Sequence, residues 1–140
     1  MPFTVASWNV LADAYIRADL YRGCHPDAID PALRFGRLVE GIEQLKADVV
    51  CLQEVEEEFS ERLAIAIPWK RCYAKKGGGR KDGCEIRVRP PAIFGPWDSF
   101  RFSDGSGHVA IVAVVPFAEG SIAVATSHLK WDPPGTLPAK

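Results

Sequence analysis

Three polar residues, Asn9, Glu54 and His128, follow apolar stretches, and their types suit chemistry on a phosphate ester. A carboxylate can hold Mg²⁺, which keeps several waters and takes substrate oxygens as further ligands. The ion polarises the phosphoryl group, an amide can fix the carboxylate or a water, and a histidine can donate to a phosphate oxygen or leaving group. The ordinary alternatives are a turn-capping asparagine, a structural histidine, and a glutamate that opens the solvated acidic run 56–58.

Each of these residues stands where a predicted strand ends. Residues 3–11 alternate and are rich in β-branched and aromatic side chains, residues 49–52 are continuously apolar, and residues 122–126 lead to the histidine. Asp30 and Pro31 suit the cap and first position of a helix between the first two strands, which predicts a parallel pair with a right-handed crossover. If the three strands are neighbours, their carboxyl ends bring the three side chains to one patch.

The rest of the chain predicts one α+β domain without an internal repeat or a linker. Gly36 and Gly41 weaken the first helix by about 1 kcal/mol each relative to alanine. The further elements expected are an irregular loop over 12–30, a helix over 57–67 stopped by Pro68, a strand over 69–74, a mobile hairpin tip at 77–79, a strand around 84–88, a strand over 109–115, and a turn over 116–121.

The composition is that of a globular protein, and its charges are unevenly distributed along the chain. The 140 residues are 47% hydrophobic and 25% charged, and no apolar run approaches the ~20 residues of a membrane span. Without the pattern of a signal peptide, a cytoplasmic location and no membrane partner are expected. Net charge is −1, but residues 70–89 carry +6, which leaves −7 elsewhere. The basic segment is either a site that attracts a phosphate-rich substrate or a solvated loop.

The four cysteines do not form a recognisable metal site. They stand at positions 24, 51, 72 and 84, with no CxxC spacing, and no second pair completes a tetrahedral site around Cys24 and His25. Reduced, structural thiols are the expected state.

Four motifs in order resemble the endonuclease/exonuclease/phosphatase superfamily with the DNase I-like fold. They are SWNVLAD at 7–13, CLQEV at 51–55, DGC at 82–84 and TSHLKWDP at 126–133. The sequence is most similar to the Ccr4-type deadenylase and nocturnin branch with its bacterial relatives. Four collinear motifs are much more specific than any one of them.

The resemblance implies a two-sheet sandwich flanked by helices, with a Mg²⁺-dependent (or Mn²⁺-dependent) phosphodiesterase or phosphatase site at one rim. By position, Glu54 matches the metal-binding glutamate, Asn9 the asparagine near metal and phosphate, and His128 the histidine that contacts the scissile phosphate. The DGC motif is expected to shape the entry to a strand. Within the basic segment, Lys81 is a candidate substrate-binding residue. RNA or a nucleotide is the expected substrate.

Two departures from the family pattern matter. After the DGC motif, alternation places Glu85, Arg87 and Arg89 on one face, which predicts a solvated face or an edge strand. The chain also lacks the Asp-x-Asn, further acid and Ser-Asp-His of the family's second half. Residues 1–140 are therefore expected to be the N-terminal half of a single catalytic domain, with one face of the first sheet bare and a C-terminal half or partner chain needed to complete the sandwich.

Three functions remain open at this point. The first is a metal-dependent hydrolase of phosphate esters, nuclease-like on RNA or nucleotides and incomplete as this chain. The second is a non-catalytic remnant or pairing module that binds metal or phosphate weakly. The third is a cysteine-based metal or redox module.

Overall fold

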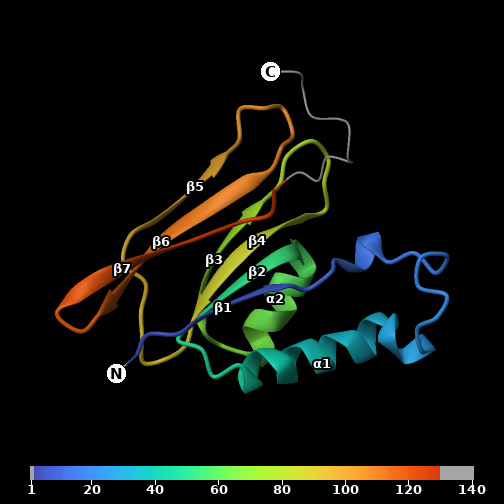
Figure 1. The fold of residues 1–140 in the computed structure, drawn as a ribbon, viewed down its shortest axis with the longest axis horizontal. Helices are drawn as coiled ribbons and strands as arrows, with labels where there is room; N and C mark the ends of the chain where they lie inside the picture. Colours follow the sequence, from blue (N-terminus) through green and yellow to red (C-terminus); the bar gives the residue numbers. More distant parts are fainter. Residues whose placement is uncertain (1, 130–140) are drawn as a thin grey trace.

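The computed structural model describes residues 2–129, which form three layers (Figure 1). Two helices cover one face of a four-stranded sheet, and a three-stranded sheet packs on its other face. The elements in chain order are β1 Val5–Asn9, α1 Pro31–Gln44, β2 Val49–Glu56, α2 Glu57–Ala66, β3 Lys70–Lys75, β4 Asp82–Val88, β5 Trp97–Arg101, β6 Val109–Phe117 and β7 Gly120–Ser127. Two short 3₁₀ turns, Asp13–Tyr15 and Pro26–Ala28, lie in the loop before α1.

The first sheet has the order β1-β2-β4-β3, and the second has the order β5-β6-β7. β1 and β2 are parallel, with Asn9 opposite Gln53, so the predicted β-α-β unit is confirmed. β4 runs antiparallel to both of its neighbours, and the second sheet is antiparallel throughout. The described residues of this chain thus contribute three strands to a second sheet.

The helices are positioned as their sequences predict. The Asp30 carboxylate accepts a hydrogen bond from the amide of Leu33 at 2.9 Å, and Pro31 is the first residue of α1. Ile42 from α1 and Leu63 from α2 pack on Val50 and Leu52 of β2 in a core between helices and sheet. β2 is thus buried on both faces, because its alternate residues Val49 and Cys51 face the second sheet.

The second sheet closes the other face of the first. Ile111, Ala113 and Val115 of β6 join Ile86 and Val88 of β4 in one core between the sheets. The expectation that one face of the first sheet would be bare is therefore wrong for the described residues. The strands that cover it come from this chain's own residues 109–127.

Several predicted boundaries shift. β6 extends to Phe117 and β7 begins at Gly120, so the connection is shorter than the turn predicted over 116–121. β5 was not predicted, because its five exposed residues show no apolar alternation.

The expectation of a solvated or edge strand over 84–88 is wrong. β4 lies between β2 and β3, and all seven of its residues are buried. Glu85 and Arg87 pair with each other beneath α2, and Arg87 also donates to the carbonyls of Ser60, Leu63 and Ile67. Their charges are buried because α2 supplies polar partners, which local sequence does not reveal.

Among residues 2–129, no helix has the length and apolar character required to cross a bilayer.

Candidate active site

Glu54 occupies a β-bulge within β2. The pairing of β2 with β4 shifts between Gln53 and Val55, and Glu54 has a φ of 56°, in the left-handed region. The strand continues to Glu56, so Glu54 interrupts the strand and does not terminate it as predicted. A bulge redirects a side chain out of the pleat, and a non-glycine residue with positive φ is a strained conformation that functional sites often contain.

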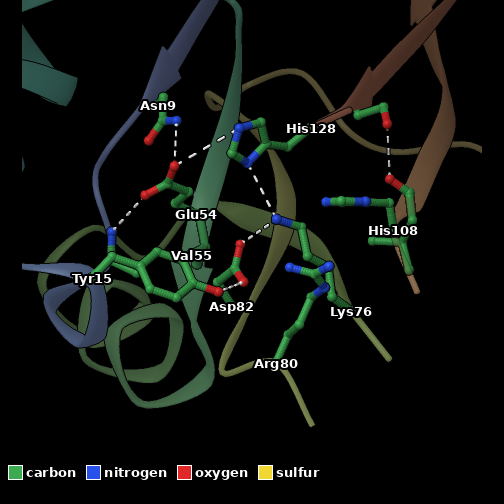
Figure 2. A network of polar contacts seen from close by, with 12 residues as sticks. Asn9, Tyr15, Glu54, Val55, Lys76, Arg80, Asp82, His108 and His128 are labelled. Atoms are coloured by element: carbon green, nitrogen blue, oxygen red, sulfur yellow. Dashed lines mark hydrogen bonds and ion pairs between the residues drawn. The ribbon is translucent and has the colours of Figure 1, made fainter. Parts of the chain in front are cut away.

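The carboxylate of Glu54 is held by residues from β1 and the loop after it (Figure 2). Asn9 Nδ2 donates to Glu54 Oε1 at 2.8 Å, and the amide of Ala12 donates to Oε2 at 3.2 Å. The amide of Leu11, itself at φ 56°, donates to Asn9 Oδ1 at 2.9 Å and so orients the asparagine side chain.

His128 follows the end of β7 and reaches the same carboxylate. Its Nε2 lies 3.8 Å from Glu54 Oε1. The structure thus brings Asn9, Glu54 and His128 together, as the strand-end argument predicts. The residues 130–133 that complete the fourth motif lie outside the described part of the chain.

Sequence reasoning missed a second group of polar residues beside His128. Lys76 Nζ lies 2.6 Å from Asp82 Oδ2 and 3.2 Å from His128 Nδ1, and the Tyr15 hydroxyl donates to Asp82 Oδ1 at 2.5 Å. Burial and the adjacent Asp82 carboxylate raise the pKa of Tyr15 to about 12, so the phenol remains a donor. Asp82 belonged to a recognised motif, but its partners come from other elements.

Beside these groups lies a cleft of about 380 Å³, lined by Tyr15, Glu54, Lys76, Arg80, His108, His128 and Leu129. His108 is buried, and its Nδ1 has no hydrogen-bond partner among the described residues. Burial lowers the pKa of His108, and the nearby positive charges of Lys76 and Arg80 lower it further.

Lys81 lies outside this cleft. It is exposed and lines two neighbouring depressions, one of which it shares with Tyr15, Arg80 and the glycine loop. The basic residues of the segment 70–89 that reach the cleft are Lys76 and Arg80. The assignment of Lys81 to substrate binding stays a prediction.

Gly83 of the DGC motif lets the start of β4 lie very close to β3. A Cβ at Gly83 would stand 2.1 Å from the carbonyl oxygen of Ala74 on β3, so only glycine fits there. This close approach keeps β3 and β4 paired to their ends, where Lys76 and Asp82 meet.

The possible metal ligands in the cleft suit a hard cation that takes few ligands from the protein. Within residues 2–129, no three His, Cys, Asp or Glu side chains are grouped so as to hold a metal together. Glu54 is the carboxylate among the residues lining the cleft, and a magnesium ion can combine one carboxylate with water and substrate oxygens. A tetrahedral zinc site would need more nitrogen or sulfur ligands.

The sequence is similar to human and plant proteins. Protein angel homolog 2 of Homo sapiens is 32% identical over 149 residues, covering 94% of this chain and 27% of that protein. Carbon catabolite repressor protein 4 homolog 2 of Arabidopsis thaliana is 45% identical over 102 residues, covering 70% of this chain and 17% of that protein. The chain therefore spans well under a third of these relatives.

The fold is also that of solved structures. ANGEL2, a 2′,3′-cyclic phosphatase, in complex with adenosine-2′,3′-vanadate matches with a TM-score of 0.79 and 25% identity, over 93% of this chain and 42% of that one. The human nocturnin catalytic domain with bound sulfate matches in fold with a TM-score of 0.72 and 21% identity, over 92% of this chain and 50% of that one.

The model of the Endonuclease/Exonuclease/phosphatase family matches residues 6–138. The two sheets flanked by helices agree with the DNase I-like fold of these solved structures. The chain belongs to the endonuclease/exonuclease/phosphatase family, whose members are hydrolytic phosphoesterases.

Proposed function

We propose that this chain forms one wall of a divalent-metal-dependent phosphoesterase site, with Mg²⁺ or Mn²⁺ as the ion and RNA or a nucleotide as the substrate. The observation that carries the proposal is the convergence of Asn9 and His128 on the carboxylate of Glu54 at the edge of an open cleft. Family membership gives the reaction class, which is hydrolysis of a phosphate ester.

Each residue has a distinct role in this proposal. Glu54 would hold the ion, which supplies polarisation of the phosphoryl group when bound. Asn9 keeps Glu54 in place through the hydrogen bond to Oε1. His128 directs an imidazole nitrogen to the same space, where it can donate to a phosphoryl oxygen or to the leaving oxygen.

The charge of the cleft supports an anionic substrate. Lys76 and Arg80 lie on the side of the cleft opposite Asn9 (Figure 2), and Arg80 has no carboxylate partner within the described residues. The ANGEL2 complex contains an adenosine derivative, which supports a nucleotide or an RNA end. A TDP2 structure of D. rerio contains a single-stranded DNA product, so DNA is the competing polymer.

The alternative is a binding module that needs a second half for turnover. It is favoured by the small number of cleft carboxylates: Glu54 stands alone in the described lining. Residues that act as a catalytic unit fail together, so one wall of a site can bind ligand without measurable turnover.

A cleavage assay separates the two candidates. The 140-residue chain is incubated with single-stranded RNA, with single-stranded DNA and with adenosine 2′,3′-cyclic phosphate, in Mg²⁺, Mn²⁺ or a chelator. The catalytic candidate, in which this wall suffices for turnover, predicts metal-dependent cleavage that falls by at least about a hundredfold in Glu54→Gln, since a metal ion contributes several kcal/mol of transition-state stabilisation.

Glu57→Gln is the matched control, because Glu57 is an exposed residue at the start of α2 that pairs with Lys75. Turnover that survives Glu54→Gln would refute the site. Absence of turnover in the unaltered chain would support the binding module. Broadening of cleft resonances by Mn²⁺, absent in Glu54→Gln, would then identify the metal site.

A further inference from the structure

We propose that Lys76 is a positioning residue that holds His128 in the tautomer with its hydrogen on Nε2. The proposed function assigns no role to Lys76 beyond its charge. The hydrogen bond between Lys76 Nζ and His128 Nδ1 carries the inference.

The chemistry of the two groups fixes the direction of this bond. A lysine ammonium has three hydrogens and no lone pair, so it can only donate. At 3.2 Å from Lys76 Nζ, His128 Nδ1 must present a lone pair. In a neutral imidazole one nitrogen is a donor and the other an acceptor, so the hydrogen of His128 stands on Nε2. A hydrogen on Nδ1 would point at the ammonium.

Lys76 is held so firmly that it can impose this choice. Its side chain is 3% exposed and Asp82 is fully buried, which places the 2.6 Å ion pair away from water. Tyr15 fixes the other oxygen of Asp82. The backbone adds further restraint, because the amide of Lys76 donates to the carbonyl of Asp82 at 3.0 Å and the amide of Gly77 to the carbonyl of Gly107 at 2.8 Å.

The consequence for the cleft is a donor in a defined place. Nε2 of His128 faces Glu54 at 3.8 Å from Oε1, a distance beyond a normal hydrogen bond (Figure 2). An N–H at this position can donate to an oxygen of a bound phosphoryl group. That last step rests on the proposed function, whereas the tautomer does not.

A purely structural role makes a different prediction. If Lys76 serves only to neutralise Asp82 within the hairpin of β3 and β4, the hydrogen of His128 is free to exchange between its two nitrogens. Stability measurements cannot separate the two roles, because both predict that loss of the buried pair destabilises the chain.

The test is the tautomer of His128 in the ¹⁵N-labelled 140-residue chain, read from two-bond ¹⁵N–¹H correlations of the ring at neutral pH. His128→Gln assigns the signals. The unaltered chain should show a protonated Nε2 and an unprotonated Nδ1. Lys76→Met should shift His128 to a mixture of tautomers or to Nδ1–H, and Lys76→Arg should retain the original pattern because its guanidinium still donates. Lys75→Met is the control, since Lys75 is half-exposed and pairs with Glu57 at the surface.

Two results would overturn the inference: Nδ1–H in the unaltered chain, or an unchanged His128 pattern in a Lys76→Met chain whose amide spectrum remains that of a folded protein. If Lys76→Met does not fold, Lys76→Gln replaces it, because a neutral amide keeps a polar group beside Asp82 and, having both a donor and an acceptor, cannot impose one tautomer on His128. The readout needs neither metal nor turnover. An inactive chain with the expected tautomer would contradict only the proposed function, and an active chain with Nδ1–H would contradict only this inference.

Discussion

Glu85 and Arg87 illustrate how charges on a central strand depend on their partners. Arg87 donates through Nε to Glu85, and its other nitrogens donate to the carbonyl of Ser60 within α2 at 3.1 Å and to that of Ile67, just after α2, at 3.0 Å. Burial raises the pKa of Glu85 and lowers that of Arg87, and each partner's charge opposes the shift of the other. The pair therefore links β4 to α2 and is stabilising only while both members are present.

Arg87→Met should lower the free energy of unfolding by about 3–5 kcal/mol, because it leaves the Glu85 carboxylate buried without its main partner. Arg22→Met, at an exposed loop position, should change it by no more than about 0.5 kcal/mol. Urea denaturation followed by circular dichroism measures both. Equal effects in the two variants would mean that water or Arg71 stabilises the Glu85 carboxylate after the loss of Arg87.

Within α1, two glycines that look alike in sequence have different surroundings. A Cβ at Gly36 would meet no atom within 4 Å, whereas a Cβ at Gly41 would approach the Trp8 ring to 2.7 Å. Gly41 therefore allows α1 to lie close to β1, the strand that carries Asn9. Of the two glycines predicted to weaken this helix, one is required by packing.

Gly36→Ala should raise the free energy of unfolding by up to about 1 kcal/mol through helix propensity. Gly41→Ala should lower it, since overpacking of a fitted contact costs about 1–3 kcal/mol and exceeds the gain in propensity. Thermal unfolding of both variants against the unaltered chain provides the comparison. Stabilisation by Gly41→Ala would show that Trp8 moves aside at little cost.

At the scale of the whole molecule, the interface between the two sheets determines the state of the cysteines. Cys51, Cys72 and Cys84 lie in this core as free thiols, and Cys24 is exposed. Burial raises the pKa of Cys51 and Cys84 to about 11 and that of Cys72 to about 12. Because the thiolate is the nucleophile, these three thiols should be inert in the folded protein.

An alkylating reagent at neutral pH should therefore modify one cysteine of the native chain and all four after denaturation, as counted by intact mass. Modification of Cys24 should leave the circular dichroism spectrum unchanged. Rapid native modification of two or more thiols would mean that the sheets separate readily, and would revive the redox module that the sequence left open.

The sequence predicted that Asn9, Glu54 and His128 lie close together, and this convergence was found where local pattern and motif agree. The apolar runs around Asn9 and Glu54, with the capped helix between them, define a β-α-β unit, and that unit aligns the ends of β1 and β2. His128 was placed by its motif, and the pairing of β7 with β6 carries it across the interface to Glu54. The bulge at Glu54 was not predicted, because a single inserted residue leaves no periodic signal.

Sequence by itself thus determined the helices, most of the strands and the three residues that meet at the cleft, because hydrophobic period, caps and motifs are local properties. Only the tertiary structure decided which charges are buried and what they contact. Lys76, Asp82, Glu85 and Arg87 fall in the segment that the sequence assigned either to substrate attraction or to a solvated loop. Each instead has a buried partner from the same hairpin or from a distant element. The physical reason is that the cost of burying a charge depends on partners which folding brings from elsewhere in the chain.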